Sequence, residues 1–305
     1  MSPVVIPFEA GEANLSWTGL CDALIKGHAL PKAEIADTLL YRGEDTLLNR
    51  SAWIDGMGLA VKCGTIFPGN PARGEPLIYG SVTLFDDTNG DLAAYIDFHL
   101  VTKWKTAGDS LLAAKRLARP DSKNILIVGA GTVGRTLWQA YSSAFPDAHF
   151  TLWNRTRANA DKMVVECPGM TVEDDLETAV RAADIVTSAT MSTDPFLKGE
   201  WFQHGQHIDL IGAYRPDMRE ADDEAMRRAR IFVDSRDTTV EHIGELTKPI
   251  ADGVISADDI IADFYDIDLF TRQSDDEITL FKNGGGAHLD LMTSRYVLDA
   301  WNDAQ

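Results

Sequence analysis

Cysteine is scarce in this sequence, and no pattern of residues suggests a metal site. The three cysteines, Cys21, Cys63 and Cys167, are odd in number and far apart. They therefore suit free, buried thiols in a reducing compartment rather than a disulfide framework. Neither these cysteines nor the seven histidines show the spacing of metal ligands. We predict no bound metal and no catalytic cysteine, because burial is the commoner fate of a lone thiol.

Basic residues and long apolar runs are also in short supply. Lysine and arginine total 28 against 47 aspartates and glutamates, a formal net charge of −19. A protein that binds duplex nucleic acid needs clustered basic side chains, so the composition argues against that class. No apolar stretch approaches the roughly 20 residues that span a bilayer, and residues 1–17 lack the basic and apolar regions of a secretory signal. The sequence thus predicts a cytoplasmic protein with no membrane and no nucleic-acid partner.

The length and the pattern of the first third indicate more than one folding unit. A chain of 305 residues is long for one hydrophobic core, so two domains are expected. Short β-like runs and helical runs alternate irregularly before residue 120. We expect a helix over 16–27 behind Ser16 as N-cap, a strand over 58–67, a hairpin over 77–101 that turns at Asn89-Gly90, and a helix over 106–118.

From Asn124 onward the pattern changes to a regular alternation of strands and helices. Apolar runs such as NILIV, HFTLW and HIDLI are separated by segments with helical periodicity. Such alternation is typical of βαβ units, which build a parallel sheet with helices on both faces. The chain therefore reads as an α/β protein, which closes with a strand, a glycine turn and an amphipathic helix over 277–301.

A glycine motif stands at the first turn of this alternating region. Gly129, Gly131 and Gly134 match the pattern G-x-G-x-x-G between an apolar strand and a helix. The first glycine makes a tight turn, the second lets the backbone approach a pyrophosphate, and the third lets the helix pack on the strand. The helix N-terminus then faces the anion. The motif in this context predicts a bound dinucleotide.

The end of the second strand indicates which dinucleotide is bound. NAD sites usually carry an acidic residue there for the ribose 2′-hydroxyl. This strand instead ends with Asn154, Arg155, Thr156 and Arg157. The two arginines would form charge-assisted hydrogen bonds with a 2′-phosphate. We therefore expect NADPH as the cofactor, with NADH weaker.

Further cofactor contacts are expected at the carboxyl end of the strand DIVTSAT, where open α/β sheets bind ligands. Thr190 and Ser192 follow that strand. The complete set of expected cofactor-binding residues is Gly129, Gly131, Thr132, Val133, Gly134, Asn154, Arg155, Thr156, Arg157, Thr190 and Ser192.

Several segments, in the same order along the chain, resemble the ornithine cyclodeaminase/mu-crystallin family. The resemblance is clearest from about Gly58 to Trp301. It rests on AVK (60–62), NGDLAAYID (89–97), TKWKTA (102–107), the glycine loop, WNRT (153–156), TMSTDPFLKGEW (190–201), IGAYRPDMREAD (211–222) and ITLFKNGGGAHLD (278–290). WNRT is similar to the NADPH-using mu-crystallin branch of the family.

The resemblance implies an architecture and an assembly. A Rossmann NAD(P)-binding domain, residues 118–285, would be inserted in an α+β substrate-binding and dimerisation domain. That second domain would comprise residues 1–117 and be completed by the C-terminal helix, 286–305. The resemblance further implies a homodimer joined through shared β-structure, and a small α-amino or α-imino acid as substrate.

The same resemblance assigns residues to the substrate. Lys62 matches the family lysine that contacts the substrate carboxylate, and Lys105 stands where the family has a carboxylate-binding arginine. Arg42 matches a further carboxylate-binding arginine, although its spacing from Lys62 leaves Arg50 as a competitor. Lysine at position 105 keeps the charge but loses the bidentate fork of arginine.

Two further positions depart from the family pattern. Tyr214 stands where cyclodeaminases have an aspartate that moves protons, and a tyrosine is not a carboxylate base at neutral pH. Leu289-Asp290 replaces the usual Glu-Asp, so Asp290 is the acid that carries over. His288 begins the final helix, where a histidine is more often a solvated residue than a ligand of the nicotinamide. Tyr214 joins Lys62, Lys105 and Arg42 in the expected catalytic group.

These features favour hydride transfer from NADPH to a cyclic ketimine acid. Δ1-Pyrroline-2-carboxylate would give proline, and Δ1-piperideine-2-carboxylate would give pipecolate, so a role in proline metabolism is expected. A protonated imine needs no dedicated strong acid, so the missing aspartate is tolerable. The alternatives are an ornithine cyclodeaminase, an amino-acid dehydrogenase and a non-enzymatic ligand-binding protein. The last is disfavoured by Lys62, a charge within the apolar strand AVKCGTIF that is costly unless it is used or paired.

Overall fold

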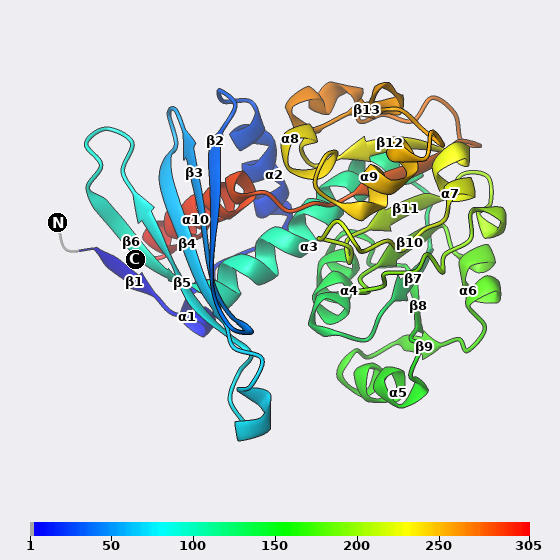
Figure 1. Cartoon of the computed structure of the whole chain (residues 1–305), viewed down its shortest axis with the longest axis horizontal. Helices are drawn as coiled ribbons and strands as arrows, with labels where there is room; N and C mark the ends of the chain where they lie inside the picture. Colours follow the sequence, from blue (N-terminus) through cyan, green and yellow to red (C-terminus); the bar gives the residue numbers. More distant parts are fainter. Residues whose placement is uncertain (1–2) are drawn as a thin grey trace. The chain divides into compact units, whose positions relative to one another are not determined.

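The computed structural model describes residues 3–305, which form two compact units (Figure 1). Unit 1 consists of the residues up to Thr106 together with Gly286–Gln305, and unit 2 consists of Ala107–Gly285. The division falls inside a long helix, α3 (Phe98–Leu117), rather than after residue 117 as the sequence suggested. Unit 2 is therefore an insertion between two parts of unit 1.

Helix α3 begins eight residues earlier than its apolar periodicity suggested. The Asp97 carboxylate accepts a hydrogen bond from the backbone N–H of Leu100 at 2.9 Å, as an N-capping residue does. This cap ends the preceding strand at Asp97 and starts the helix at Phe98. The expected cap on the first long helix is present, since Ser16 Oγ accepts from Gly19 N at 3.1 Å.

Unit 1 contains a six-stranded sheet in the order β1-β6-β5-β4-β3-β2. Its strands are β1 (Val4–Ile6), β2 (Glu34–Arg42), β3 (Asp45–Ile54), β4 (Gly58–Ile66), β5 (Ile78–Phe85) and β6 (Leu92–Asp97). Strand β1 runs parallel to β6, and all other neighbours are antiparallel. The helices of this unit are α1 (Phe8–Glu12), α2 (Trp17–His28) and α10 (Ala287–Asp303), with one 3-10 turn, η1 (Pro71–Arg73).

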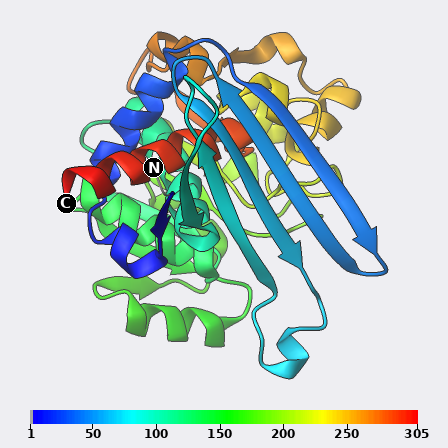
Figure 2. The same ribbon diagram turned by 90° about the vertical axis from the view of Figure 1, so that its left-hand side faces the viewer.

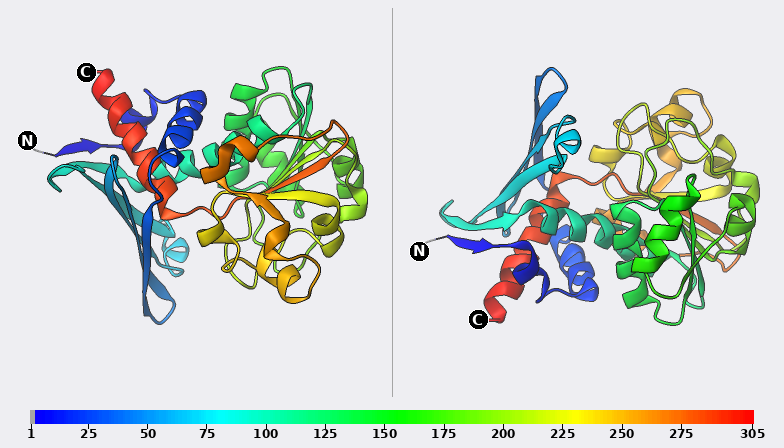
Figure 3. Two further views of the ribbon diagram at one scale, coloured as in Figure 1. Left: turned by 90° about the horizontal axis from the view of Figure 1, so that it is seen from above. Right: turned by 90° about the horizontal axis from the view of Figure 1, so that it is seen from below.

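One face of this sheet is covered by helices of the same unit. Helix α10 packs against β3 and β4, and it also contacts α2 (Figure 3). Side chains alternate between the faces of a strand, so directly paired residues share a face. Arg50 of β3, Lys62 of β4 and Val82 of β5 form one such row on the covered face.

The other face of the sheet, which we call the open face, carries exposed apolar side chains. They come from five strands: Val5, Leu40, Trp53, Tyr79 and Tyr95. The edge of the sheet is a long hairpin of β2 and β3 (Figure 2), whose register runs without a break from Glu34 opposite Trp53 to Arg42 opposite Asp45. The open face is thus an extended surface that no part of unit 1 buries.

Unit 2 is a parallel sheet of eight strands in the order β13-β12-β14-β11-β10-β7-β8-β9, with helices on both faces (Figures 1 and 3). The strands are β7 (Asn124–Val128), β8 (His149–Trp153), β9 (Met170–Val172), β10 (Ile185–Ser188), β11 (His207–Leu210), β12 (Ala229–Val233), β13 (Ile260–Ala262) and β14 (Ile278–Lys282). The helices are α4 (Thr132–Ala144), α5 (Arg157–Glu166), α6 (Leu176–Ala182), α7 (Asp223–Arg228), α8 (Arg236–Thr239) and α9 (Gly244–Ala251), with 3-10 turns η2 (Gly199–Trp201), η3 (Ala257–Asp259) and η4 (Phe264–Leu269).

The strand order of unit 2 reverses between β7 and β10. The chain runs outward from β7 to β8 and β9, then returns to build β10 on the other side of β7. In open α/β sheets this switch point leaves a crevice at the carboxyl ends of the strands, where ligands bind. Strands β10 and β11 are buried along their whole length, as expected for central parallel strands covered on both faces. Among residues 3–305 no helix is both long enough and apolar enough to cross a membrane.

Candidate functional site

The glycine loop of unit 2 joins β7 to α4 at the switch point. Gly129 adopts a φ of 114°, a conformation that side chains with a Cβ rarely take. A Cβ on Gly134 would collide with the carbonyl oxygen of Gly129, so this glycine allows the close packing of helix on strand. Around Gly131, by contrast, no atom of the described residues other than Gly131 and its chain neighbours lies within 4 Å of the position that a Cβ would take. This open space suits a phosphate that approaches the backbone.

The N–H groups of the first turn of α4 are not capped by a side chain. Gly131 is the N-cap and supplies no side-chain hydrogen bond to the helix start. Thr132, Val133 and Gly134 form that turn, and N–H groups at a helix N-terminus attract negative charge. The loop and the helix start therefore fit the pyrophosphate of a dinucleotide.

Asn154 connects the end of β8 to this loop. Its Oδ1 accepts a hydrogen bond from Ala130 N at 3.0 Å, and its Nδ2 donates to Thr156 O at 2.8 Å. An aspartate could accept from Ala130 but could not donate to Thr156. The amide thus fixes the second residue of the glycine motif relative to the strand end, a role that the sequence did not suggest.

The two arginines at this strand end differ in their surroundings. Arg157 donates hydrogen bonds to Asp161 at 2.7 Å and Asp174 at 2.6 Å. These carboxylates raise the pKa of Arg157 and occupy its guanidinium. Arg155 is exposed, and no ion pair is recorded for it among residues 3–305. Arg155 is therefore the freer of the two to meet a phosphate.

The remaining expected residues of unit 2 follow the central strands. Thr190 follows β10, and both its backbone N–H and its hydroxyl donate to the buried Glu220. Ser192 Oγ donates to Asp194 O at 2.7 Å. Tyr214 lies after β11 with 56% of its surface exposed. The carboxyl ends of β10 and β11 thus carry all three.

A buried ion pair lies in unit 1, between the sheet and α10. Lys62 Nζ donates to Asp290 Oδ1 at 2.8 Å, and both side chains are almost completely buried. Burial lowers the pKa of Lys62 to about 8; Asp290 opposes this shift, while Lys105 and Arg50 add to it. Burial alone would raise the pKa of Asp290, but the three cations outweigh burial and hold that pKa below its ordinary value.

Lys105 reaches the same cluster from α3. It lies two turns after Phe98, so the two share a helix face. The Phe98 ring lies 4.6 Å from Lys62 Nζ and fills the space above Gly64 and Gly80, two sheet positions where a Cβ would strike it. Lys105 is only 8% exposed, and no ion pair is recorded for it among the described residues. Asp290 interacts electrostatically with Lys62, Lys105 and Arg50, so its single negative charge is shared among three cations. A buried cation that is only partly balanced is costly, and the cluster therefore suits an anion.

The structure corrects the expected position of Arg42. This residue lies at the end of β2 opposite Asp45, on the face of the sheet away from Lys62. Its exposed guanidinium pairs with Asp45 at 2.8 Å. Arg50 is the residue directly opposite Lys62, and its guanidinium pairs with Asp37 at 3.0 Å. The strand period of two and the register thus place Arg50, rather than Arg42, on the face of the sheet that carries Lys62.

His288 also differs from its expected place on the surface. It is completely buried at the start of α10, with its ring 5.3 Å from that of His28. Burial, together with His28 and the nearby cations, lowers the pKa of His288 well below its ordinary value. His288 is thus a neutral member of the wall around the lysine cluster.

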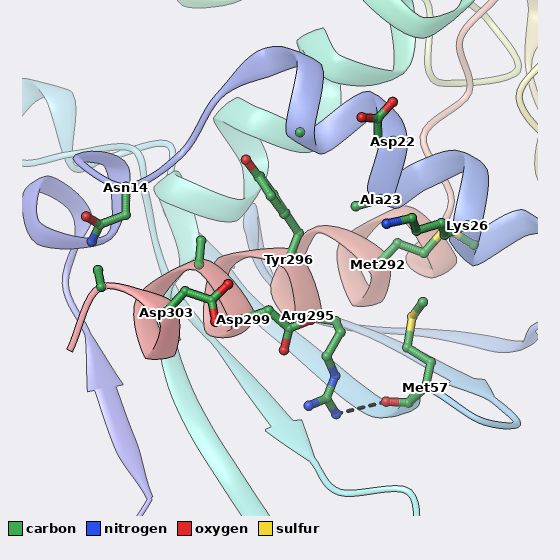
Figure 4. Close-up of a pocket in the computed structure, with 13 residues that line it drawn as sticks. Asn14, Asp22, Ala23, Lys26, Met57, Met292, Arg295, Tyr296, Asp299 and Asp303 are labelled. Atoms are coloured by element: carbon green, nitrogen blue, oxygen red, sulfur yellow. Dashed lines mark hydrogen bonds between the residues drawn. The ribbon is translucent and has the colours of Figure 1, made fainter.

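A separate cavity of about 620 Å³ lies between α2 and α10 (Figure 4). Asp22, Asp299 and Asp303 line it together with Lys26 and Arg295. Arg295 is held by a 2.8 Å hydrogen bond to Met57 O. The carboxylates make this cavity a poor place for an anionic substrate, and Lys62 is not among its lining residues. No group of three or more potential metal-binding side chains is present among residues 3–305.

Comparisons with known proteins agree with this geometry. Residues 53–305 match the model of the ornithine cyclodeaminase/mu-crystallin family. The Δ1-pyrroline-2-carboxylate reductase of Paracoccus denitrificans is 47% identical over 304 residues, covering 97% of this chain and 96% of the relative.

Two solved structures share the complete fold. One is the Δ1-pyrroline-2-carboxylate reductase of Thermococcus litoralis in complex with NADH and L-proline, with a TM-score of 0.88, 26% identity and coverage of 99% and 98% of the two chains. The other is an archaeal alanine dehydrogenase dimer with bound NAD, with a TM-score of 0.89, 27% identity and coverage of 100% and 97%. The family resemblance of the sequence is confirmed, and so is a Rossmann-type fold for unit 2. The chain belongs to the ornithine cyclodeaminase/mu-crystallin family.

Proposed function

We propose that this protein is a reductase that transfers a hydride from a nicotinamide cofactor to the C=N bond of a cyclic ketimine acid. The substrates are Δ1-pyrroline-2-carboxylate, which gives proline, Δ1-piperideine-2-carboxylate, which gives pipecolate, or both. The name and the identity of the Paracoccus relative support this activity, as does the fold shared with the Thermococcus enzyme. The observation that carries the proposal is the group of three cations in unit 1. Lys62 and Lys105 are buried, Arg50 is half-buried, and Lys105 forms no direct ion pair among residues 3–305.

These three cations are suited to the carboxylate of an imino acid. Asp290 and Asp37 balance two of the charges, through Lys62 and Arg50 respectively. One positive charge remains for the substrate. Lys62 is the central member, because Asp290 and the Phe98 ring fix its ammonium from two sides. It holds the substrate carboxylate while the ring nitrogen of the substrate stays protonated, and a protonated imine is the form that accepts a hydride.

The glycine loop and the first turn of α4 would hold the pyrophosphate of the cofactor. The bound nicotinamide supplies the hydride. We propose NADPH as the preferred cofactor and NADH as a weaker one. The support is the end of β8, where Arg155 and Thr156 are exposed and the strand end carries no acidic residue. Tyr214, Thr190 and Ser192 are proposed as neighbours of the nicotinamide because they follow the central strands.

We also propose a homodimer formed through the open face of unit 1. Exposed apolar side chains from five strands give this face the character of an interface. The related alanine dehydrogenase is a dimer. A cytoplasmic location is proposed as well, and it is supported by the three cysteines, none of which forms a disulfide within residues 3–305.

The activity is tested by the absorbance of the cofactor at 340 nm. Purified protein is mixed with NADPH or NADH and with either cyclic imine. Oxidation of the cofactor, faster with NADPH, is the expected result. If neither imine is reduced while ornithine releases ammonia in the presence of NAD, the protein is a cyclodeaminase and the proposal is wrong.

A further inference from the structure

A buried carboxylate outside the lysine cluster joins the ends of two central strands of unit 2. Glu220 lies between β11 and α7 and is completely buried. Its Oε1 accepts hydrogen bonds from Ser188 Oγ at 2.6 Å, Thr190 N at 2.8 Å and Thr190 Oγ1 at 2.7 Å. Its Oε2 accepts from Gly212 N at 2.7 Å and Ala213 N at 3.3 Å. One side chain thus binds the segment after β10 and the segment after β11.

The donors require a carboxylate at this position. Thr190, Gly212 and Ala213 each present a backbone N–H, which can only donate. At least one of these N–H groups faces each oxygen of Glu220. A glutamine would turn its own N–H₂ group toward one of the two segments in either orientation. Both segments can be held at once only by two accepting oxygens.

The carboxylate is itself fixed from the far side. Glu245 of α9 accepts hydrogen bonds from Glu220 N at 2.8 Å and from Ala221 N at 2.9 Å. The carbonyl oxygen of Glu220 accepts from Phe196 N and Leu197 N, both at 3.0 Å. Glu220 is therefore a fixed point to which the two strand ends are tied.

The segment after β10 lies directly against the glycine loop. A Cβ on Gly129 would come within 2.9 Å of Ala189 O, and a Cβ on Gly212 would collide with the backbone of Thr190. Residues 189–190 are thus packed between Gly129, the first glycine of the cofactor motif, and Gly212, which follows β11. Because interiors of this density transmit displacements, a shift of Thr190 moves the wall of the glycine loop.

We propose that Glu220 is a positioning residue for cofactor binding: it sets the shape of the rim formed by residues 189–192 and 212–214, beside the glycine loop. The inference rests on the proposed cofactor site of unit 2. It makes Glu220 act through Thr190, Gly212 and Ala213 rather than by contact with the cofactor.

The test compares direct binding of NADPH and NADH to wild-type protein and to Glu220→Gln, by the change in cofactor fluorescence. The variant is expected to bind both cofactors about tenfold more weakly, the effect of one lost hydrogen bond to a charged group. The ratio of the two dissociation constants should stay unchanged, since the rim is separate from the end of β8. An unchanged Kd for both cofactors would overturn the proposal.

Asp184→Asn is the matched control. Asp184 is also a carboxylate that accepts backbone N–H hydrogen bonds, but it lies at the opposite end of β10. It precedes β10 and accepts from Lys123 N and Asn124 N, both at 2.9 Å, at the start of β7. This variant should lose thermal stability much as Glu220→Gln does, yet keep the Kd of wild-type protein. If equal losses of Tm come with equal losses of affinity, Glu220 is merely structural and the proposal is wrong.

Two further outcomes are decisive. If Glu220→Gln does not fold, Ser188→Ala removes one donor from the same oxygen and should raise both Kd values about threefold; no change would overturn the proposal. If wild-type protein binds neither cofactor, the cofactor site itself is wrong and the positioning role falls with it. If instead wild-type protein binds the cofactors and Glu220→Gln binds them equally well, the cofactor site stands and only the positioning role of Glu220 is wrong.

Discussion

Lys62 carries a positive charge in a place that water scarcely reaches, and its neighbours determine the pH range in which it holds that charge. Burial lowers its pKa to about 8, Asp290 limits the shift, and Lys105 and Arg50 extend it. The group is thus protonated at neutral pH and loses its charge just above. A lysine that binds a carboxylate is useful only in the protonated form.

The pH dependence of kcat/KM should report this lysine. Above pH of about 8 the fraction of charged Lys62 falls, so kcat/KM for the imino acid should decrease by about tenfold for each further pH unit. Lys62→Arg keeps the charge at all these pH values and should shift the decrease upward. Asp290→Asn removes the stabilising carboxylate and should shift it downward. Identical profiles for all three proteins would exclude Lys62 and leave the substrate imine as the titrating group.

Arg155 and Arg157 should contribute unequally to the choice of cofactor. Arg155→Ala is expected to raise the Kd of NADPH by about tenfold or more and to change that of NADH little, since a 2′-phosphate loses a charged partner. Arg157→Ala should have the smaller effect, because Asp161 and Asp174 already occupy that guanidinium. Titration of both variants with both cofactors measures the difference. Equal weakening of NADH and NADPH would remove the 2′-phosphate argument.

At this scale the sequence could identify residue types but not their partners. Lys62, Lys105 and the glycines were found because each sits in a recognisable motif. The choice between Arg42 and Arg50 needed the register of β2, β3 and β4, which spacing along the chain does not reveal. Glu220 gave no signal, because a single glutamate in a loop looks like any solvated acid until its donors are known.

In the turn from β7 into α4, two positions require glycine for different physical reasons. Gly134 is required by packing, since its missing Cβ lets the helix approach the Gly129 carbonyl. Gly131 has open space around it and an ordinary extended backbone, with φ −90° and ψ −174°. The first demand concerns stability and the second concerns the ligand, so the two can be separated by experiment.

Gly134→Ala and Gly131→Ala should therefore show opposite phenotypes. Gly134→Ala overpacks the turn and should lower the free energy of unfolding by about 1–3 kcal/mol. Gly131→Ala should leave Tm unchanged but raise the Kd of the cofactor at least about tenfold, because the methyl group fills the space of a phosphate. Thermal denaturation and cofactor titration of both variants provide the measurement. A large loss of Tm in Gly131→Ala would contradict the assignment.

Helices and strands could be predicted from the sequence where their apolar residues follow a clear period, and not where that period is obscured. Most strands and helices of unit 2 could be predicted because the alternating pattern is regular and its glycine turn is distinctive. The short elements β9, α8, α9 and β13 were not predicted, because three to eight residues carry too little periodicity. Helix α3 was predicted from residue 106 although it starts at Phe98, because residues 98–101 are β-rich in composition and were assigned to the hairpin over 77–101; strand β6 in fact ends at Asp97, which caps the helix. The hairpin of β2 and β3 was not predicted, because apolar residues on both of its faces obscure the alternation.

At the scale of the whole molecule, the open face of unit 1 is an extended surface with exposed apolar side chains from five strands. Its apolar side chains would be exposed to water in a single chain, and a second copy that covers them would remove this cost. A formal net charge of −19 opposes association in general, so contact between two copies is expected at an apolar surface.

Trp53→Glu should weaken the dimer. The substitution places a charge in the open face, where burial against a second copy would leave it unpaired. Sedimentation should give twice the 33.5 kDa chain mass for wild-type protein and the single-chain mass for the variant. Val165→Glu, at an exposed apolar site on α5, serves as the control and should remain dimeric. Monomeric wild-type protein would refute the assembly.

The insertion of unit 2 has a consequence for the order in which function is acquired. Lys62 and Asp290 are 228 positions apart, and the entire cofactor unit is encoded between them. During synthesis Lys62 therefore leaves the ribosome first, followed by unit 2 with its complete sheet. Helix α10, which carries Asp290, is synthesised last. A chain cut just before α10 would have its glycine loop yet lack the charge balance around Lys62. Proteolytic clipping at that junction would uncouple cofactor binding from turnover.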